Sequence, residues 1–256
     1  MGILGLSGSM GMATGPPLGS FIAMEFDHDL MFRLAAGFAV LSILVVLNIQ
    51  ESLPSARKFK SSDLRIPISA VYEPRSFMPA LMALMILLPF GVLVTVIPDK
   101  SDLLGIENRG LFFLVYVVFS MLIRVPAGRF SDRVGRAPLT LVSALLIGIA
   151  LIGIAYSGSK EHFLISAAIG GVGAGLGSPI LFAWTADVAL EEHRARAFST
   201  TFMALEIGIG GGGLIGGWIY DNDPSRIHLS FLFAAIVCFL AAIILLIRKQ
   251  RMGRWD

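Results

Sequence analysis

Two charged side chains lie inside long apolar runs of this sequence. A charge there is costly to bury in a membrane, so it usually has a partner or marks a functional site. Glu206 stands between Leu205 and Ile207, and its carboxyl group can bind a proton or a cation. The alternative is a carboxylate near a membrane interface that bonds to a neighbouring helix or reaches water. Arg124 precedes a basic stretch by one turn, which favours a side chain that extends to the interface. Both residues are candidates for a proton or substrate site.

Aromatic residues in the same apolar runs can line a hydrophobic cavity, but they pack against neighbouring helices more often. We therefore expect packing roles for most of this set: Phe112, Phe113, Tyr116, Trp184 and Phe202.

Residues 128–136 read Gly-Arg-Phe-Ser-Asp-Arg-Val-Gly-Arg and separate two long apolar runs. An arginine at the centre of a bilayer costs about 2.5–3.5 kcal/mol, so this stretch is not expected in hydrocarbon. We expect a tight loop at one membrane face, with Gly128 and Gly135 providing the turn geometry. Asp132 is expected to accept hydrogen bonds from the loop backbone or to lie at a helix N-terminus.

The sequence offers carboxylate partners for the arginines of this stretch. Arg133 and Arg136 are expected to pair with the acidic residues of the next loop on the same face, namely Asp187, Glu191 or Glu192. Such a cluster would hold that face closed. The alternative is that the arginines only mark the orientation of the chain in the membrane.

Several other classes of site are not predicted. The four histidines are scattered over different loops, and Cys238 is the only cysteine, so no catalytic residue, metal site or cofactor is expected. Gly208, Gly210 and Gly213 form a Gly-x-Gly-x-x-Gly string, but apolar residues surround it and no strand–helix unit precedes it. The net charge of +2 is too small to suggest nucleic acid.

Composition indicates an all-α integral membrane protein. Hydrophobic residues make up 55% of the chain and charged residues 15%, whereas a soluble domain carries about 25% charged residues. The mean hydropathy is +0.80. Charges cluster in short patches, and the gaps between them are long enough for helices that cross about 30 Å of bilayer. We expect eight transmembrane helices, over residues 2–22, 33–50, 76–98, 109–127, 138–157, 162–186, 198–220 and 229–248.

Lysine and arginine are distributed unequally between the two sets of loops. The set formed by 51–75, 128–137, 187–197 and the C-terminal tail holds 14 of them, and the opposite set holds 5. Because basic loops stay in the cytoplasm, this asymmetry places the first set and both termini there. The expected location is the cell membrane, with the lipid bilayer as the surrounding partner.

The two ends of the chain share a repeated pattern. Three glycines at spacing four occur twice with an offset of 197 residues, at Gly11, Gly15 and Gly19 and again at Gly208, Gly212 and Gly216. The offset spans six helices, so the expected repeat unit is a six-helix bundle. Residues 1–50 are then the last two helices of a first unit, 51–75 a cytoplasmic linker and 76–256 a complete second unit. Glycines at this spacing, like those between 171 and 177, let helices approach closely.

These motifs resemble those of the major facilitator superfamily. Residues 128–136 resemble its signature loop, Gly-x-Leu-x-Asp-Arg-x-Gly-Arg, with Phe130 at the usual Leu position. The first helix resembles the fifth-helix motif of its proton-coupled exporters, Gly-x8-Gly-x3-Gly-Pro-x2-Gly, through Gly2, Gly11, Gly15, Pro16 and Gly19.

The resemblance implies a secondary transporter rather than an enzyme. It implies proton-coupled efflux of a small amphipathic compound by alternating access, in a chain that corresponds to helices five to twelve of twelve. Since the first four helices are missing by this count, we expect residues 1–256 alone to insert without transporting. The alternative is a non-transporting membrane remnant or scaffold. The substrate and the oligomeric state are not predicted.

Overall fold

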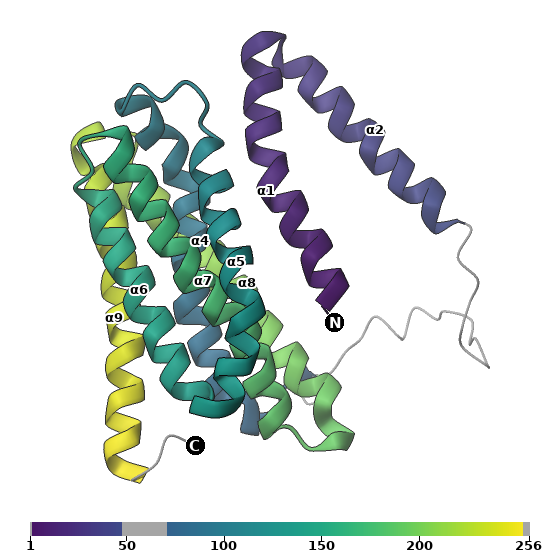
Figure 1. Cartoon of the computed structure of the whole chain (residues 1–256), viewed down its shortest axis with the longest axis vertical. Helices are drawn as coiled ribbons and strands as arrows, with labels where there is room; N and C mark the ends of the chain where they lie inside the picture. Colours follow the sequence, from purple (N-terminus) through teal and green to yellow (C-terminus); the bar gives the residue numbers. More distant parts are fainter. Residues whose placement is uncertain (1, 48–70, 253–256) are drawn as a thin grey trace.

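The computed structural model describes residues 2–47 and 71–252, and every regular element within these ranges is helical (Figure 1). The predicted all-α fold is therefore confirmed. In chain order the elements are α1 (Gly2–Glu25), α2 (His28–Val46), η2 (Pro74–Ser76), α4 (Phe77–Leu103), α5 (Leu111–Val134), α6 (Arg136–Ala155), α7 (Lys160–Val188), η3 (Glu191–His193), α8 (Arg194–Tyr220), η4 (Pro224–Arg226) and α9 (Ile227–Met252).

Fewer helices than expected have the composition of a membrane span. Among the described residues six helices are long and apolar enough, and α5 makes a seventh if its two segments form one span. The eighth expected span is α1, which has 24 residues but is diluted by glycines and by Pro16 and Pro17. Segments Leu111–Arg124 and Pro126–Val134 of α5 meet at 48°, because Pro126 removes a backbone hydrogen bond.

The prediction of a loop over 128–137 is wrong. Helix α5 continues to Val134, and α6 begins at Arg136, so a single residue separates the two helices. That residue is Gly135, whose φ of 97° lies in the region that other residues avoid. Gly128 lies inside α5 with open space beside it, so it provides no turn. The polar side chains of this stretch are accommodated within the two helices, in part by bonds among Ser131, Asp132 and Arg136.

Helices α4 and α8 approach closely enough that only glycine fits between them. A Cβ atom on Gly212 would lie 2.0 Å from the Leu88 carbonyl oxygen, and one on Gly208 would lie 2.5 Å from the Leu84 carbonyl oxygen. Gly91 of α4 faces α8 in the same way. This glycine series thus packs α8 closely on α4, and dispersion contacts along the two backbones stabilise the pair. The packing predicted for the first-helix motif of Gly2, Gly11, Gly15, Pro16 and Gly19 stays a prediction.

A second glycine series joins α5 to α7. A Cβ atom on Gly171 would lie 2.1 Å from the Tyr116 carbonyl oxygen, and one on Gly175 would lie 2.3 Å from the Ser120 carbonyl oxygen. These glycines were expected to form a packing or bending surface, and the structure shows packing. Helix α6 in turn packs against both α7 and α9, which closes a bundle of six helices, α4 to α9. Large buried side chains fill its centre, among them Met82, Phe112, Phe163 and Phe231.

Helices α1 and α2 lie to one side of this bundle (Figure 1). Helix α1 packs against α5, and the Asn108 side chain donates to the Pro17 carbonyl oxygen at 3.4 Å. Helix α2 contributes no buried residue. Gly11 and Gly15 have no atom within 4 Å of a built Cβ, unlike Gly208 and Gly212. Most of the predicted linker falls outside the described residues, so the division into two units stays a prediction.

The glycine contact between α4 and α8 gives a direct test of the packing. We expect Gly212→Ala to destabilise the protein by about 1–3 kcal/mol, because the new methyl group forces the helices apart. The matched control is Gly210→Ala in the same helix, where a Cβ meets no atom within 4 Å. Thermal unfolding in detergent can be followed by dye labelling of Cys238, which is buried and the only cysteine. Equal melting temperatures for the two variants would contradict the proposed close contact.

Candidate functional site

Arg136 holds together the ends of three helices. Its Nε donates to Asp187 Oδ2 of α7 at 2.8 Å, and its Nη1 donates to Asp132 Oδ1 of α5 at 2.7 Å. The same Nη1 donates to the Ser131 hydroxyl at 2.6 Å. Only 20% of the Arg136 side chain is exposed, whereas both carboxylates are largely exposed. We name Ser131, Asp132, Arg136 and Asp187 the arginine cluster.

The structure brings some of the predicted residues together and leaves others apart. The expected pairing of Arg136 with Asp187 is present. Asp132 does not lie at a helix N-terminus, because α5 extends past it, and its carboxylate faces Arg136 one turn ahead. Arg133 is exposed and has no ion pair with any described residue. Ser131 was not singled out from the sequence, although it stands five residues before Arg136.

Glu206 lies at the middle of α8, twelve residues after Arg194 and fourteen before Tyr220. At 1.5 Å per residue it is about 18 Å from the first residue of the helix. Glu206 is thus far from both ends of its helix, and the choice between a proton site and an interfacial residue stays a prediction. Glu206 is exposed and makes no hydrogen bond or ion pair within the described ranges.

Large apolar side chains are exposed further along α8. Leu214, eight residues after Glu206, is 78% exposed, and Trp218, twelve residues after it, is 81% exposed. Phe202 precedes Glu206 by one turn, is 49% exposed and stands 4.9 Å from Phe182 of α7 between ring centroids. Phe112, Phe113, Tyr116 and Trp184 are buried, as expected for packing residues, whereas Phe202 packs against Phe182 and remains about half exposed.

Arg124 occupies a different setting from the one expected. It ends the first segment of α5, where the helix bends, and α5 continues for ten more residues. The residue is therefore not one turn from the end of its helix, and its extension to the interface stays a prediction. Its side chain is partly buried.

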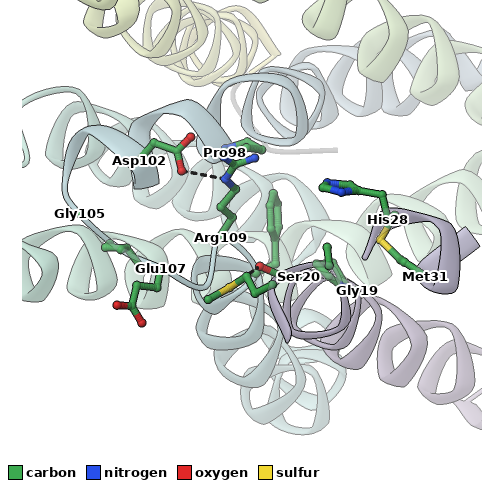
Figure 2. A pocket seen from close by; sticks show the side chains of 15 residues that line it. Gly19, Ser20, His28, Met31, Pro98, Asp102, Gly105, Glu107 and Arg109 are labelled. Atoms are coloured by element: carbon green, nitrogen blue, oxygen red, sulfur yellow. Dashed lines mark hydrogen bonds and ion pairs between the residues drawn. The ribbon is translucent and has the colours of Figure 1, made fainter. Parts of the chain in front are cut away.

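A cleft of about 640 Å³ opens at the other end of the molecule from the arginine cluster. Figure 2 shows its walls: His28 and Met31 of α2 on one side, Gly19 and Ser20 of α1 below, and the segment between α4 and α5 opposite. Across that segment Arg109 Nε donates to Asp102 Oδ1 at 2.7 Å. The cleft is open to its surroundings, and its lining combines apolar residues with the charged side chains of Asp102, Glu107 and Arg109.

The described residues contain no group of three or more histidine, cysteine, aspartate or glutamate side chains that could hold a metal ion. The chemistry that these sites offer is proton or cation binding at Glu206, ion pairing at the arginine cluster and apolar contact in the cleft.

If the arginine cluster ties the three helix ends together, its loss should lower the stability of the protein. We expect Arg136→Gln to reduce stability by about 1–2 kcal/mol, because it leaves Asp132 and Asp187 without their shared cation. Arg133→Gln is the matched control and should change stability by less than about 0.5 kcal/mol. The melting temperature in detergent reports both, and high salt should narrow the difference. If both variants melt together at low salt, the cluster is not an anchor.

Several known proteins are similar in sequence to parts of this chain. An uncharacterised MFS-type transporter of Methanocaldococcus jannaschii is 20% identical over 229 residues, covering 87% of this chain and 56% of that protein. Multidrug resistance protein 2 of Bacillus subtilis is 27% identical over 61% of this chain and 39% of its own length. Multidrug resistance protein MdtL of Shewanella sp. (strain ANA-3) is 33% identical over 45% of this chain and 30% of its own.

The chain thus spans about half, or less, of the length of these relatives. The family model matches residues 80–255, which is more than half of the chain and includes all but the first residues of the six-helix bundle. It also includes the arginine cluster and Glu206. A match over this much of the sequence, in an all-helical membrane fold, shows that the chain belongs to the Major Facilitator Superfamily.

Proposed function

We propose that this protein takes part in proton-coupled export of small amphipathic compounds by alternating access. The family is one of transporters rather than enzymes, and the chain is a multi-pass membrane protein of that family. Two of the three relatives described above are named for multidrug resistance, which supports export of amphipathic compounds. Proton coupling rests on one observation, the position of Glu206.

Glu206 supports the proposal because of where it stands. A carboxylate at the middle of a membrane helix is costly in lipid and therefore faces a cavity or another part of the protein. The exposed face around it includes Phe202, which offers an aromatic surface beside the charge. A carboxyl group in such a place can take up a proton on one side of the membrane and release it on the other. Arg124 at the α5 bend is a second candidate for this site.

The arginine cluster supports a conformational role. We propose that Gly135 forms the turn between α5 and α6. We propose that the ionic contacts of Arg136 with Asp132 and Asp187 hold this end of the bundle closed. Gly128 and Arg133 belong to the same stretch, and we place them at its exposed surface. Because each contact is partly exposed, it can break and reform as helices move.

The proposed orientation puts the arginine cluster and both termini in the cytoplasm of the cell. The support is the 14 to 5 distribution of lysine and arginine between the two sets of loops. We further propose that 76–256 form a complete six-helix unit and that α1 and α2 are the last two helices of a first unit. On this view the exposed face of α8 and the open glycine face of α1 meet further helices of the fold.

Reporter fusions test the orientation. A phosphatase reporter is active outside and a fluorescent protein is fluorescent inside, so the two give opposite signals. We expect cytoplasmic signals after Gln250 and within 55–65, and outside signals near Asp27 and Asp223, because basic loops are retained. An outside signal from 55–65 would contradict the orientation.

Proton coupling can be tested in proteoliposomes with ethidium, a flat amphipathic cation, and an imposed pH gradient. Residues 1–256 and the longest reading frame that contains them are reconstituted in parallel. We expect the longer form to transport in proportion to the gradient, and Glu206→Gln to remove that dependence, because an amide keeps the shape but binds no proton. Glu192→Gln, an exposed carboxylate of η3, is the matched control and should keep it.

The outcomes separate the alternatives. We expect residues 1–256 alone to insert without ethidium flux, because the face around Glu206 stays open; flux above that of empty vesicles would contradict this. Unchanged gradient dependence in Glu206→Gln would reduce this residue to a structural one. Absence of flux in both forms would favour a membrane protein that does not transport.

A further inference from the structure

The segment leading into α4 is tied to the start of α8 by contacts that the proposed transport does not use. The Glu73 backbone N–H donates to the Thr200 hydroxyl at 2.8 Å. The Thr200 hydroxyl lies 2.9 Å from two carbonyl oxygens that can accept its proton, those of Val71 and Arg196. Since Val71 and Arg196 are in different segments, one side chain bridges the approach to α4 and the first turn of α8.

Glu73 adds a charged contact to this bridge. Its Oε2 lies 3.1 Å from Nδ1 of His193, the last residue of η3, and its Oε1 accepts a weak hydrogen bond from the Arg75 backbone at 3.4 Å. Glu73 is only 5% exposed. Burying a carboxylate is unfavourable unless a positive charge or hydrogen bonds compensate, so the state of His193 decides how well this carboxylate is accommodated.

We propose that Glu73 and His193 form a proton-sensitive latch between the approach to α4 and the start of α8. Histidine is the side chain that ordinarily changes charge between about pH 5 and 8. When the imidazole is protonated, the contact is an ion pair with a hydrogen bond, the stronger form. When it is neutral, at most a hydrogen bond remains. The latch therefore tightens as the pH falls and loosens as it rises.

The other charged groups nearby do not share this behaviour. On the elements that pack around the pair they are Asp187 of α7, Arg75 of η2, Glu191 and Glu192 of η3, Arg194 and Arg196 of α8, and Arg248, Lys249 and Arg251 of α9. Asp187 is bound to Arg136, and Arg194 lies 3.7 Å from Glu191. Carboxylates, guanidinium groups and the lysine ammonium ordinarily keep their charge over this pH range, so the change is assigned to His193.

The latch acts on the helix that carries Glu206. His193 immediately precedes α8, and Thr200 stands six residues before Glu206 in the same helix. Tightening the latch fixes this end of α8 to the approach to α4 and opposes its movement. Regulation of transport by pH through α8 rests on the proposed function. The contact between Glu73 and His193, and its response to pH, do not.

Hydrogen exchange measured by mass spectrometry tests the latch without any transport assay. The protein in detergent is compared at pH 6 and pH 8, after correction for the intrinsic pH dependence of exchange. We expect the amides of 72–76 and of the first turns of α8 to exchange about five- to tenfold more slowly at pH 6, because the charged form holds them closed. Peptides from α6 serve as the internal reference.

Three variants identify the titrating group. His193→Gln keeps a hydrogen-bond donor but no titration and should abolish the pH dependence. His193→Lys keeps a positive charge at both pH values and should protect the segment at both. Glu192→Gln, the neighbouring exposed carboxylate, is the matched control and should behave as the wild type. A pH-independent wild type, or a His193→Gln variant that keeps the pH dependence, would overturn the latch.

Discussion

The approach of helix backbones through glycine is the constraint on which the rest of this structure depends. Within a bilayer there is little hydrophobic drive between apolar helices, so stability comes from contact area and from satisfied polar groups. Gly208 and Gly212 let α8 lie directly on the Leu84 and Leu88 backbone of α4, and another glycine series does the same for α5 and α7. With these pairs fixed, α6 and α9 complete the bundle, and the polar side chains gather at its ends.

Most ion pairs of the bundle lie at the ends of its helices rather than along their middle parts. Near the helix ends, charges meet in pairs: Arg136 with two aspartates at one end, and Arg109 with Asp102 at the other. Glu206 and Arg124 differ, since Glu206 stands at the middle of α8 on an exposed face and Arg124 stands at the bend inside α5. A charged group away from the helix ends is costly in lipid, whereas ion pairs near the ends can lie close to water.

The sequence predicts the helices and their packing residues well, because apolar length and glycine spacing are local properties. It also predicts the Arg136–Asp187 pair, since both residues adjoin helix ends that must lie on one side. It predicts the joint between α5 and α6 poorly: charged residues suggested a loop over 128–137, yet α5 continues to Val134 and its polar side chains bond to Arg136 of α6. It also misses the contact of Glu73 with His193, because 120 residues separate the two and no motif joins them.

The single-residue joint at Gly135 has a mechanical consequence. Between the bend at Pro126 and this joint, the last part of α5 is a rod of nine residues with a pivot at each end. Arg136 lies directly beyond one pivot and is bonded both to the rod, through Ser131 and Asp132, and to α7, through Asp187. This last part of α5 cannot tilt alone, because its rotation must either move α7 with it or break the bonds of Arg136. A tilt at this end of α5 is therefore passed on to α7.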